Sequence, residues 1–144
     1  MPKTFVVDAS VCLKLLLEDE VYSQEAVELF KGYRDSKIKL ISPNIIIYEL
    51  ANAIRTMFLK NKTNTEKAIT YLKRLLKIFP NIVQMDDVVD ICLKNALKYN
   101  ISVYDASYIT LAIGNNITLV TADDKLVKNV SNSKLAISLK DIRI

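Results

Sequence analysis

Four acidic residues, each placed in or directly after a short apolar run, are the groups of this chain best suited to chemistry. They are Asp8 after 5–7, Glu49 within 45–50, Asp105 after 101–104 and Asp123 after 117–122. Carboxylates are seldom buried unless something offsets their charge. If the fold brings these acids together, a hard divalent cation would relieve their repulsion and would prefer their oxygen atoms. The pattern therefore favours a metal-dependent site for phosphoryl transfer.

Several other catalytic chemistries are excluded by residues that the chain lacks. It contains no histidine, so Ser-His-Asp and Cys-His catalysis and histidine zinc sites are absent. Its two cysteines, Cys12 and Cys92, stand in apolar helical patterns without a Cys-x-x-Cys motif, and we expect buried free thiols. Any catalysis must use carboxylates, hydroxyls, lysines, tyrosines or a metal ion.

Three polar residues close to the acids are candidates for a supporting role. The hydroxyls of Ser10 and Thr121, and the amide of Asn52 one turn after Glu49, could orient a carboxylate or a metal-bound water. A helix cap or an exposed position is the alternative for each of them. Ser10 also suits the N-cap of the helix that follows Asp8, which would leave Asp8 free for the site.

Helix capping offers a structural interpretation for some of the acids. Ser102-x-x-Asp105 resembles a capping box, so Asp105 could serve only the start of its helix. Thr121-x-x-Asp124 is a second capping box, with Thr121 as the predicted N-cap. Asp123 is then left without a structural role, which favours it over Asp124 as the site residue, and Asp124 stays open as the alternative.

The distribution of basic residues points to a polyanionic partner. The net charge is +4 and the sequence pI is about 9.0. Seven cations stand between residues 55 and 77 against the single acid Glu66: Arg55, Lys60, Lys62, Lys67, Lys73, Arg74 and Lys77. A basic segment near an acidic, metal-binding centre suits a nucleic-acid backbone, although a solvated helical face would show the same residues.

Length and composition predict one ordered domain over residues 1–144. The chain has 51% hydrophobic and 25% charged residues, which is typical of a globular protein of single-domain size. No apolar run approaches the roughly 20 residues of a membrane span. Residues 1–4 lead directly into a strand-like run without the apolar segment of a signal peptide. We therefore expect a cytoplasmic protein that does not enter a membrane.

Strands and helices alternate along the chain, which predicts an α/β fold. Strands are expected over residues 4–8, 38–41, 82–84, 117–121 and 135–138. Helices are expected over residues 10–17, 22–33, 43–58, 65–79, 102–113 and 121–130. Ser42 is the predicted N-cap of the third of these helices, and a loop at 61–64 precedes the fourth. A further helix is expected to end near residue 99, with Asp86 or Asp87 as its cap. Such alternation builds a parallel sheet covered on both faces, whose ligands bind at the carboxyl ends of the strands. The four acids can converge there.

At these acids the sequence resembles a PIN domain, and most closely the small ribonuclease toxins of VapBC toxin–antitoxin systems. The matching segments are Val6-Val7-Asp8-Ala9-Ser10-Val11, Tyr48-Glu49-Leu50-Ala51-Asn52-Ala53, Tyr104-Asp105-Ala106-Ser107-Tyr108 and Leu119-Val120-Thr121-Ala122-Asp123. Each motif is short, but all four occur in order across nearly the whole chain. The resemblance implies a three-layer α/β/α sandwich with a central parallel sheet.

The resemblance also implies an activity, a cofactor and partners. It implies a Mg²⁺- or Mn²⁺-dependent endoribonuclease that binds one or two ions through Asp8, Glu49, Asp105 and Asp123. It further implies homodimerisation and inhibition by a cognate antitoxin. A PIN-like RNA- or protein-binding module that has lost catalysis is the alternative.

Hydrolysis by such a site would use water as the nucleophile and leave a 5′-phosphate and a 3′-hydroxyl. The RNA backbone would then be positioned by basic residues of the segment described above: Arg55, Lys60, Lys62, Lys73, Arg74 and Lys77. Tyr48 or Tyr104 could stack on a base, although we expect both of them to pack in the core.

Overall fold

The computed structural model describes residues 1–15, 21–60, 64–78 and 81–144. Within these ranges the elements are β1 (Lys3–Val7), α1 (Ala9–Lys14), α2 (Ser23–Arg34), β2 (Ile38–Pro43), α3 (Ile46–Lys60), α4 (Thr65–Lys77), β3 (Asn81–Val83), α5 (Val89–Tyr99), α6 (Val103–Asn115), β4 (Thr118–Thr121), α7 (Asp124–Asn129) and β5 (Ala136–Ser138). Short 3₁₀ turns are η1 (Asp86–Val88), η2 (Ser131–Ser133) and η3 (Leu139–Asp141). None of the helices in the described ranges has the length and apolar character needed to span a bilayer.

A parallel sheet forms the centre of the fold, as the alternating pattern predicts. In the described ranges it has five strands in the order β3-β2-β1-β4-β5. The central strand β1 pairs with β2 through Val6 and Ile41, and with β4 through Val7 and Val120. Its continuous apolar sequence is buried because both faces of the strand are covered.

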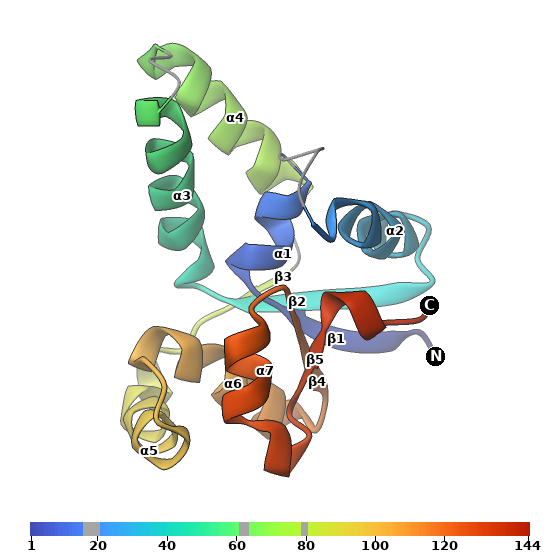
Figure 1. The fold of residues 1–144 in the computed structure, drawn as a ribbon, viewed down its shortest axis with the longest axis vertical. Coiled ribbons are helices and arrows are strands. Elements are labelled where there is room, and N and C mark those ends of the chain that lie inside the picture. The colour runs from blue at the N-terminus through green and yellow to red at the C-terminus, as the bar shows by residue number, and fades with distance from the viewer. Residues whose placement is uncertain (16–20, 61–63, 79–80) are drawn as a thin grey trace.

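Helices cover both faces of this sheet and complete the predicted three-layer α/β/α arrangement. α1 and α2 lie on one side of the sheet, and α5 and α6 lie on the other (Figure 1). α6 contacts β1, β2 and β4, and its residues from Ala106 to Ala112 are all buried. A helix that is apolar around most of its circumference belongs in such a central position. α6 therefore fixes Asp105, at its amino end, relative to the sheet.

α3 and α4 form a hairpin that extends away from the sheet (Figure 1). Ile54 on α3 and Leu75 on α4 are buried, and the rings of Phe58 and Tyr71 meet edge to face with their centroids 5.4 Å apart. Asn64 caps α4 by accepting a hydrogen bond from the Lys67 backbone N–H. The hairpin thus presents its outer surfaces to solvent while a narrow apolar seam holds its two helices together.

The end of β2 differs from the sequence prediction. Ser42 was expected to be a helix N-cap followed by Pro43 at the first helical position, but both residues belong to β2. Ser42 is fully buried and its hydroxyl donates to the Val7 carbonyl at 2.6 Å, while β2 pairs with β3 through Ser42 and Pro43. α3 begins later, at Ile46. Pairing between strands outweighed the local capping signal.

Other element boundaries shift by smaller amounts. The acids expected to cap the helix before residue 99 form the turn η1, and α5 starts at Val89 without a side-chain cap. Asp86 instead accepts a hydrogen bond from the Asn44 side chain. The predicted ends of two helices, at 17 and 79, and the loop at 61–63 lie outside the described residues.

The two cysteines are buried and free, as the sequence predicts. Burial is the main cause of a pKa for the Cys12 thiol well above its ordinary value, and the nearby Asp8 carboxylate adds to the effect. A thiol that keeps its proton is a poor nucleophile and metal ligand. Cys12 therefore acts as a small apolar side chain of the core.

Ser42→Ala should lower the free energy of unfolding by about 1 kcal/mol, because the Val7 carbonyl loses a buried hydrogen-bond donor. Urea denaturation of the variant and of the parent protein measures this difference. Ser131→Ala, at an exposed serine, is the matched control and should change the stability little. Equal stabilities of Ser42→Ala and the parent would show that the Ser42 hydroxyl does not help to hold β1 and β2 together.

Candidate metal and phosphodiester site

The site lies where β1 and β4 end side by side. β1 has β2 on one side and β4 on the other, so the direction in which the chain adds strands reverses between β1 and β4. Ligands of open parallel sheets bind at the carboxyl ends of the strands at this switch point. Because Val7 pairs with Val120, Asp8, directly after β1, lies next to Thr121, the last residue of β4. The expected convergence of distant segments begins with this pair.

Asp8 is the most enclosed of the four acids, with only 6% of its surface exposed. One carboxylate oxygen accepts from the Ser10 hydroxyl and from the Val11 backbone N–H at 3.3 Å. The other oxygen accepts from the Thr121 hydroxyl. Asp8 is therefore the N-cap of α1, and the prediction that Ser10 has this role was wrong. Ser10 and Thr121 both contact the carboxylate, where the sequence placed them as supporting residues.

The electrostatic environment of Asp8 opposes its ionisation. Burial raises the pKa of the Asp8 carboxyl to about 6, and repulsion from Glu49 contributes in the same direction. The hydrogen bonds from Ser10, Thr121 and Val11 favour the ionised form but do not overcome the burial. A positive charge placed beside Asp8 would therefore be stabilising at neutral pH.

Glu49 is held by a residue that the sequence reasoning missed. The hydroxyl of Tyr108 donates to Glu49 Oε1 at 2.6 Å and so joins the start of α3 to α6. Burial and repulsion by Asp105 raise the pKa of Glu49, while this hydrogen bond lowers it. Burial and the Glu49 carboxylate raise the pKa of Tyr108, which keeps its hydroxyl a donor. The available signal was Tyr108 within a helix that is mostly apolar, because a buried tyrosine hydroxyl needs a partner.

Asp105 stands in the first turn of α6. The Ser102 hydroxyl accepts from the Asp105 backbone N–H at 3.0 Å, which confirms Ser102 as the N-cap. The Asp105 side chain is half-buried. Burial is the main reason for its raised pKa, the Ser102 side chain opposes that rise by hydrogen bonding to the Asp105 side chain, and repulsion from Asp123 adds to it. Asp105 thus has a neighbouring carboxylate in addition to its place in a capped helix.

Asp123 has a structural role that the sequence did not predict. Its carboxylate is the N-cap of α7 and accepts from the backbone N–H groups of Lys125 at 3.0 Å and Leu126 at 3.2 Å. Thr121, the predicted cap, instead accepts from the Asp123 backbone N–H while it donates to Asp8. The capping argument for Asp123 was therefore wrong, although Asp123 does lie beside Asp105.

Asp124, the alternative to Asp123, is engaged elsewhere. Its carboxylate accepts from the Tyr22 hydroxyl at 3.1 Å and from the Ser138 hydroxyl at 2.9 Å, and these bonds lower its pKa. They tie α7 to the start of α2 and to the end of β5. Asp124 therefore serves the packing of α7.

The four acids form a series of electrostatic neighbours. Glu49 raises the pKa of Asp8, Asp105 raises that of Glu49, and Asp123 raises that of Asp105. In the part of the chain that is described, no three acidic or cysteine side chains lie close enough together to form a metal-binding group. The donor set is nevertheless made of carboxylate oxygens, which are the ligands that Mg²⁺ and Mn²⁺ prefer. The chemistry of the donors fits such an ion.

A cavity of about 300 Å³ opens beside two of these acids. Its lining includes Asp105, Asp123, Ser102, Lys125 and Asn129. Lys125 is an exposed cation beside this cavity. The sequence gives little sign of such a role, because Lys125 stands alone directly after two acids. The cavity can admit a polar group next to the Asp105–Asp123 pair.

The predicted basic residues lie on the hairpin and not around the acids. Arg55 and Lys60 are exposed on α3, and Lys73, Arg74 and Lys77 are exposed on α4. Asn52, also exposed, lies on α3 one turn beyond Glu49. Lys62 falls outside the described residues. The structure therefore places a basic surface on the helix that carries Glu49 and on the helix beside it.

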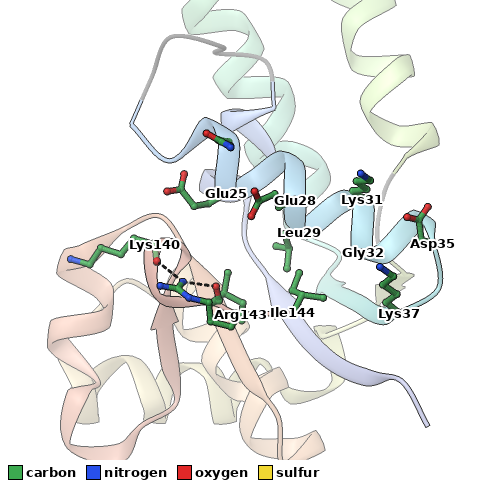
Figure 2. A pocket seen from close by; sticks show the side chains of 12 residues that line it. Glu25, Glu28, Leu29, Lys31, Gly32, Asp35, Lys37, Lys140, Arg143 and Ile144 are labelled. Carbon is green, nitrogen blue, oxygen red and sulfur yellow. Dashed lines mark hydrogen bonds between the residues drawn. The ribbon is translucent and has the colours of Figure 1, made fainter.

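The larger cavity of about 590 Å³ contains none of the predicted site residues. Figure 2 shows it between α2 and the C-terminal segment, where Glu25 and Glu28 lie near Lys140 and Arg143. Acidic and basic side chains alternate around it, so it lacks the uniform sign that a phosphate backbone requires. The region of the four acids remains the candidate site.

Comparison with known families agrees with this fold. Residues 5–131 match the sequence profile of the PIN domain. The chain belongs to the PIN domain family. The matched region begins within β1, ends at the first residue of η2 and includes all four acids.

Solved structures show the same fold over nearly the whole chain. PAE2754 from Pyrobaculum aerophilum is 26% identical, with a TM-score of 0.70 over 97% of this chain and 93% of that one. A toxin-antitoxin complex from Klebsiella pneumoniae contains a chain that is 14% identical, with a TM-score of 0.64 over 96% and 99% of the two chains. FitAcB from Neisseria gonorrhoeae is 16% identical, with a TM-score of 0.66 over 96% and 99%. No curated protein sequence matches the chain.

The buried Asp8 carboxyl should make stability depend on pH in a defined direction. Its pKa is about 6 in the folded protein and about 3.9 in an unfolded chain. The folded state therefore binds the proton more tightly, and its stability falls as the pH rises from about 4 to about 6. Two pH units correspond to roughly 3 kcal/mol, so Asp8→Asn should raise the free energy of unfolding by up to about this amount at pH 8 and by little at pH 4.

Urea denaturation in EDTA at the two pH values tests this expectation. Asp90→Asn, at an exposed aspartate on α5, is the control and should change stability little at either pH. A gain for Asp8→Asn that is the same at pH 4 and pH 8 would mean that ionisation of Asp8 is not its source.

Proposed function

We propose that this PIN domain is a Mg²⁺- or Mn²⁺-dependent endoribonuclease that acts as the toxin of a type II toxin–antitoxin system. The observation that carries this proposal is the set of mutually repelling carboxylates at the switch point of a parallel sheet. A bound cation would reduce the repulsion within this set, and the set lies where proteins of this fold class bind their ligands. Membership of the PIN family supports the same conclusion.

The proposed metal ligands are Asp8, Glu49, Asp105 and Asp123. A bound ion would supply a water of lowered pKa and neutralise charge on a phosphodiester. The chain's own groups prepare the ligands for this: Ser10 and Thr121 hold the Asp8 carboxylate, and Tyr108 holds Glu49. Fixed ligand orientation is what hydrogen-bonded groups around a metal site provide.

RNA is the proposed substrate, bound through its phosphates along the α3–α4 hairpin. Exposed cations on both helices support this, because clustered lysine and arginine side chains bind phosphates without regard to sequence. The proposed contacts are Arg55, Lys60, Lys62, Lys73, Arg74 and Lys77. Glu49 shares α3 with two of them, so a strand on the hairpin would lead toward the acids.

An antitoxin and a second copy of the chain are the proposed protein partners. The likeness to a chain of a toxin-antitoxin complex supports the first. For the second, α5 offers Val89, Leu93 and Leu97, which are exposed at successive turns of one helical face. Such an unpaired apolar stripe suits packing against an identical helix. An RNA-cleaving toxin of this kind would act in the cytoplasm.

Purified protein should cut labelled single-stranded RNA with Mn²⁺ or Mg²⁺ and should not cut it in EDTA. The Asp8→Asn, Asp105→Asn variant should lose activity by roughly a hundredfold or more, because two of the four proposed carboxylate ligands of the metal ion are removed. Asp90→Asn is the control and should cut like the parent. The first products should carry 5′-phosphates.

Each alternative result of this assay has a definite meaning. Equal cutting by the double variant would identify a contaminating nuclease. Cyclic 2′,3′-phosphates among the first products would contradict attack by water. Isothermal titration with Mn²⁺ separates the remaining case, because an inactive binding module without metal affinity would give no heat.

Lys73→Ala, Arg74→Ala should weaken RNA binding and flatten its salt dependence. Each phosphate of a single strand that the protein no longer neutralises reduces the slope of log K against log salt by about 0.7, so the double variant should show a slope smaller by about 1.4. Fluorescence anisotropy over a salt series measures this slope. The control variant Lys37→Ala, Lys39→Ala removes the same charge at the amino end of β2, away from the carboxyl ends of the strands, and should leave the slope unchanged. An unchanged slope for the hairpin variant would exclude Lys73 and Arg74 as phosphate ligands.

A further inference from the structure

Two tyrosines beside the acids are exposed where the sequence led us to expect core packing. Tyr48 has 76% of its surface exposed and Tyr104 has 63%. The expectation that both pack in the core was wrong. Tyrosine is enriched at binding surfaces, because its ring provides a large contact area at little cost in side-chain entropy. Two of them in equivalent positions next to the candidate site call for a common explanation.

The two tyrosines have the same relation to the two middle acids of the series. Tyr48 directly precedes Glu49 in the first turn of α3, and Tyr104 directly precedes Asp105 in the first turn of α6. Adjacent Cα atoms are about 3.8 Å apart, so each ring begins within one residue of a carboxylate. Consecutive helical residues point about 100° apart, which lets the acid face the site while the ring faces solvent.

The hydrogen bond between Tyr108 and Glu49 fixes these two helix starts against each other. Tyr104 lies one turn before Tyr108 on the same face of α6. The Tyr108 hydroxyl reaches Glu49, whose neighbour in α3 is Tyr48. The two exposed rings therefore stand at the starts of two helices that this hydrogen bond holds together.

A polynucleotide whose phosphate approaches these acids would bring its bases close to both rings. Bases in a duplex are already stacked and paired, so only unpaired nucleotides can stack on protein side chains. Beyond Tyr48, Asn52 and Arg55 occupy the next turns of the same exposed face of α3. This face thus offers an aromatic ring, an amide and a cation in sequence, which are the groups that bind a base and its backbone.

We propose that Tyr48 and Tyr104 stack on the nucleotides that flank the cleaved phosphodiester and make this site selective for unpaired RNA. This inference rests on the proposed ribonuclease function, and it assigns substrate selection to two residues outside the acidic group. Because stacking uses the ring and not the hydroxyl, phenylalanine should replace either tyrosine, whereas alanine should not. Because no charge is involved, loss of stacking should leave the salt dependence of binding unaltered.

Binding of a labelled single-stranded RNA and of the matching duplex, measured by fluorescence anisotropy in an Asp8→Asn background, tests the proposal without cleavage. Tyr48→Ala and Tyr104→Ala should each raise the Kd for the single strand by roughly tenfold, with the salt slope unchanged. Tyr48→Phe and Tyr104→Phe should restore most of the affinity. Duplex binding should be weaker and insensitive to all four substitutions. Val27→Ala, at a residue of α2 that is 53% exposed, controls for loss of exposed apolar surface and should bind like its background.

Failure of this inference is distinguishable from failure of the proposed function. Single-strand binding that neither alanine substitution weakens would overturn the stacking role and leave the nuclease proposal standing. Equal weakening by phenylalanine and alanine would also overturn it, because the hydroxyl would then be the contact. Absence of RNA binding by the Asp8→Asn background and by the unaltered protein in EDTA would overturn both. Since both tyrosines are exposed, thermal unfolding should be unchanged, and a thermal shift would reveal any folding defect.

Discussion

Burial of the Asp8 carboxylate between β1 and β4 is the constraint on which the rest of the structure depends. An ionised group in that position must be surrounded by donors, and two distant segments supply them: the Ser10 hydroxyl and the Val11 backbone N–H in α1, and the Thr121 hydroxyl at the end of β4. The contact with Thr121 exists only because β4 lies beside β1 in the sheet. Strand order, the turn into α1 and the position of α7 are therefore coupled through one carboxylate. In the described part of the chain every buried polar side-chain atom has a hydrogen-bond partner.

These donors hold Asp8 in place without removing its electrostatic penalty. Its pKa remains raised because burial outweighs the hydrogen bonds, and the pKa values of Glu49 and Asp105 are shifted in the same direction. Neutral side chains of similar size at these positions would give a more stable folded state. The fold thus retains a local excess of negative charge that a bound cation can offset. Hydrogen bonds such as that from the Tyr108 hydroxyl to Glu49 hold the carboxylates in place, so that they do not rotate into solvent, where their mutual repulsion would be weaker.

The sequence was sufficient for those features that local patterns determine. Apolar runs separated by helical periodicity led to the parallel sheet and to acids at the ends of its strands, since both follow from period and order. Contacts between residues distant in the chain could not be obtained in this way. Ser42 and Thr121 both look like N-caps locally, but their hydroxyls bond to the Val7 carbonyl and to Asp8, which are 35 and 113 residues away. Likewise, an apolar run cannot tell which side chain of a helix start faces outward, so Tyr48 and Tyr104 were expected in the core.

A protein that attracts a polyanion to an anionic site needs its basic residues to be separated in space from the acidic residues of that site. Here the exposed cations stand on the α3–α4 hairpin, which extends away from the sheet (Figure 1), and the acids stand at the end of β1 and at the starts of α3, α6 and α7. Exposed charges farther apart than about 8–10 Å are largely screened at physiological salt, so the hairpin can attract phosphates without being cancelled by the acids. Close to the acids, however, that attraction is weak, and a strand would have to be held by contacts that carry no charge. Exposed aromatic rings beside Glu49 and Asp105 meet this requirement, because stacking is insensitive to the repulsion between carboxylates and phosphates.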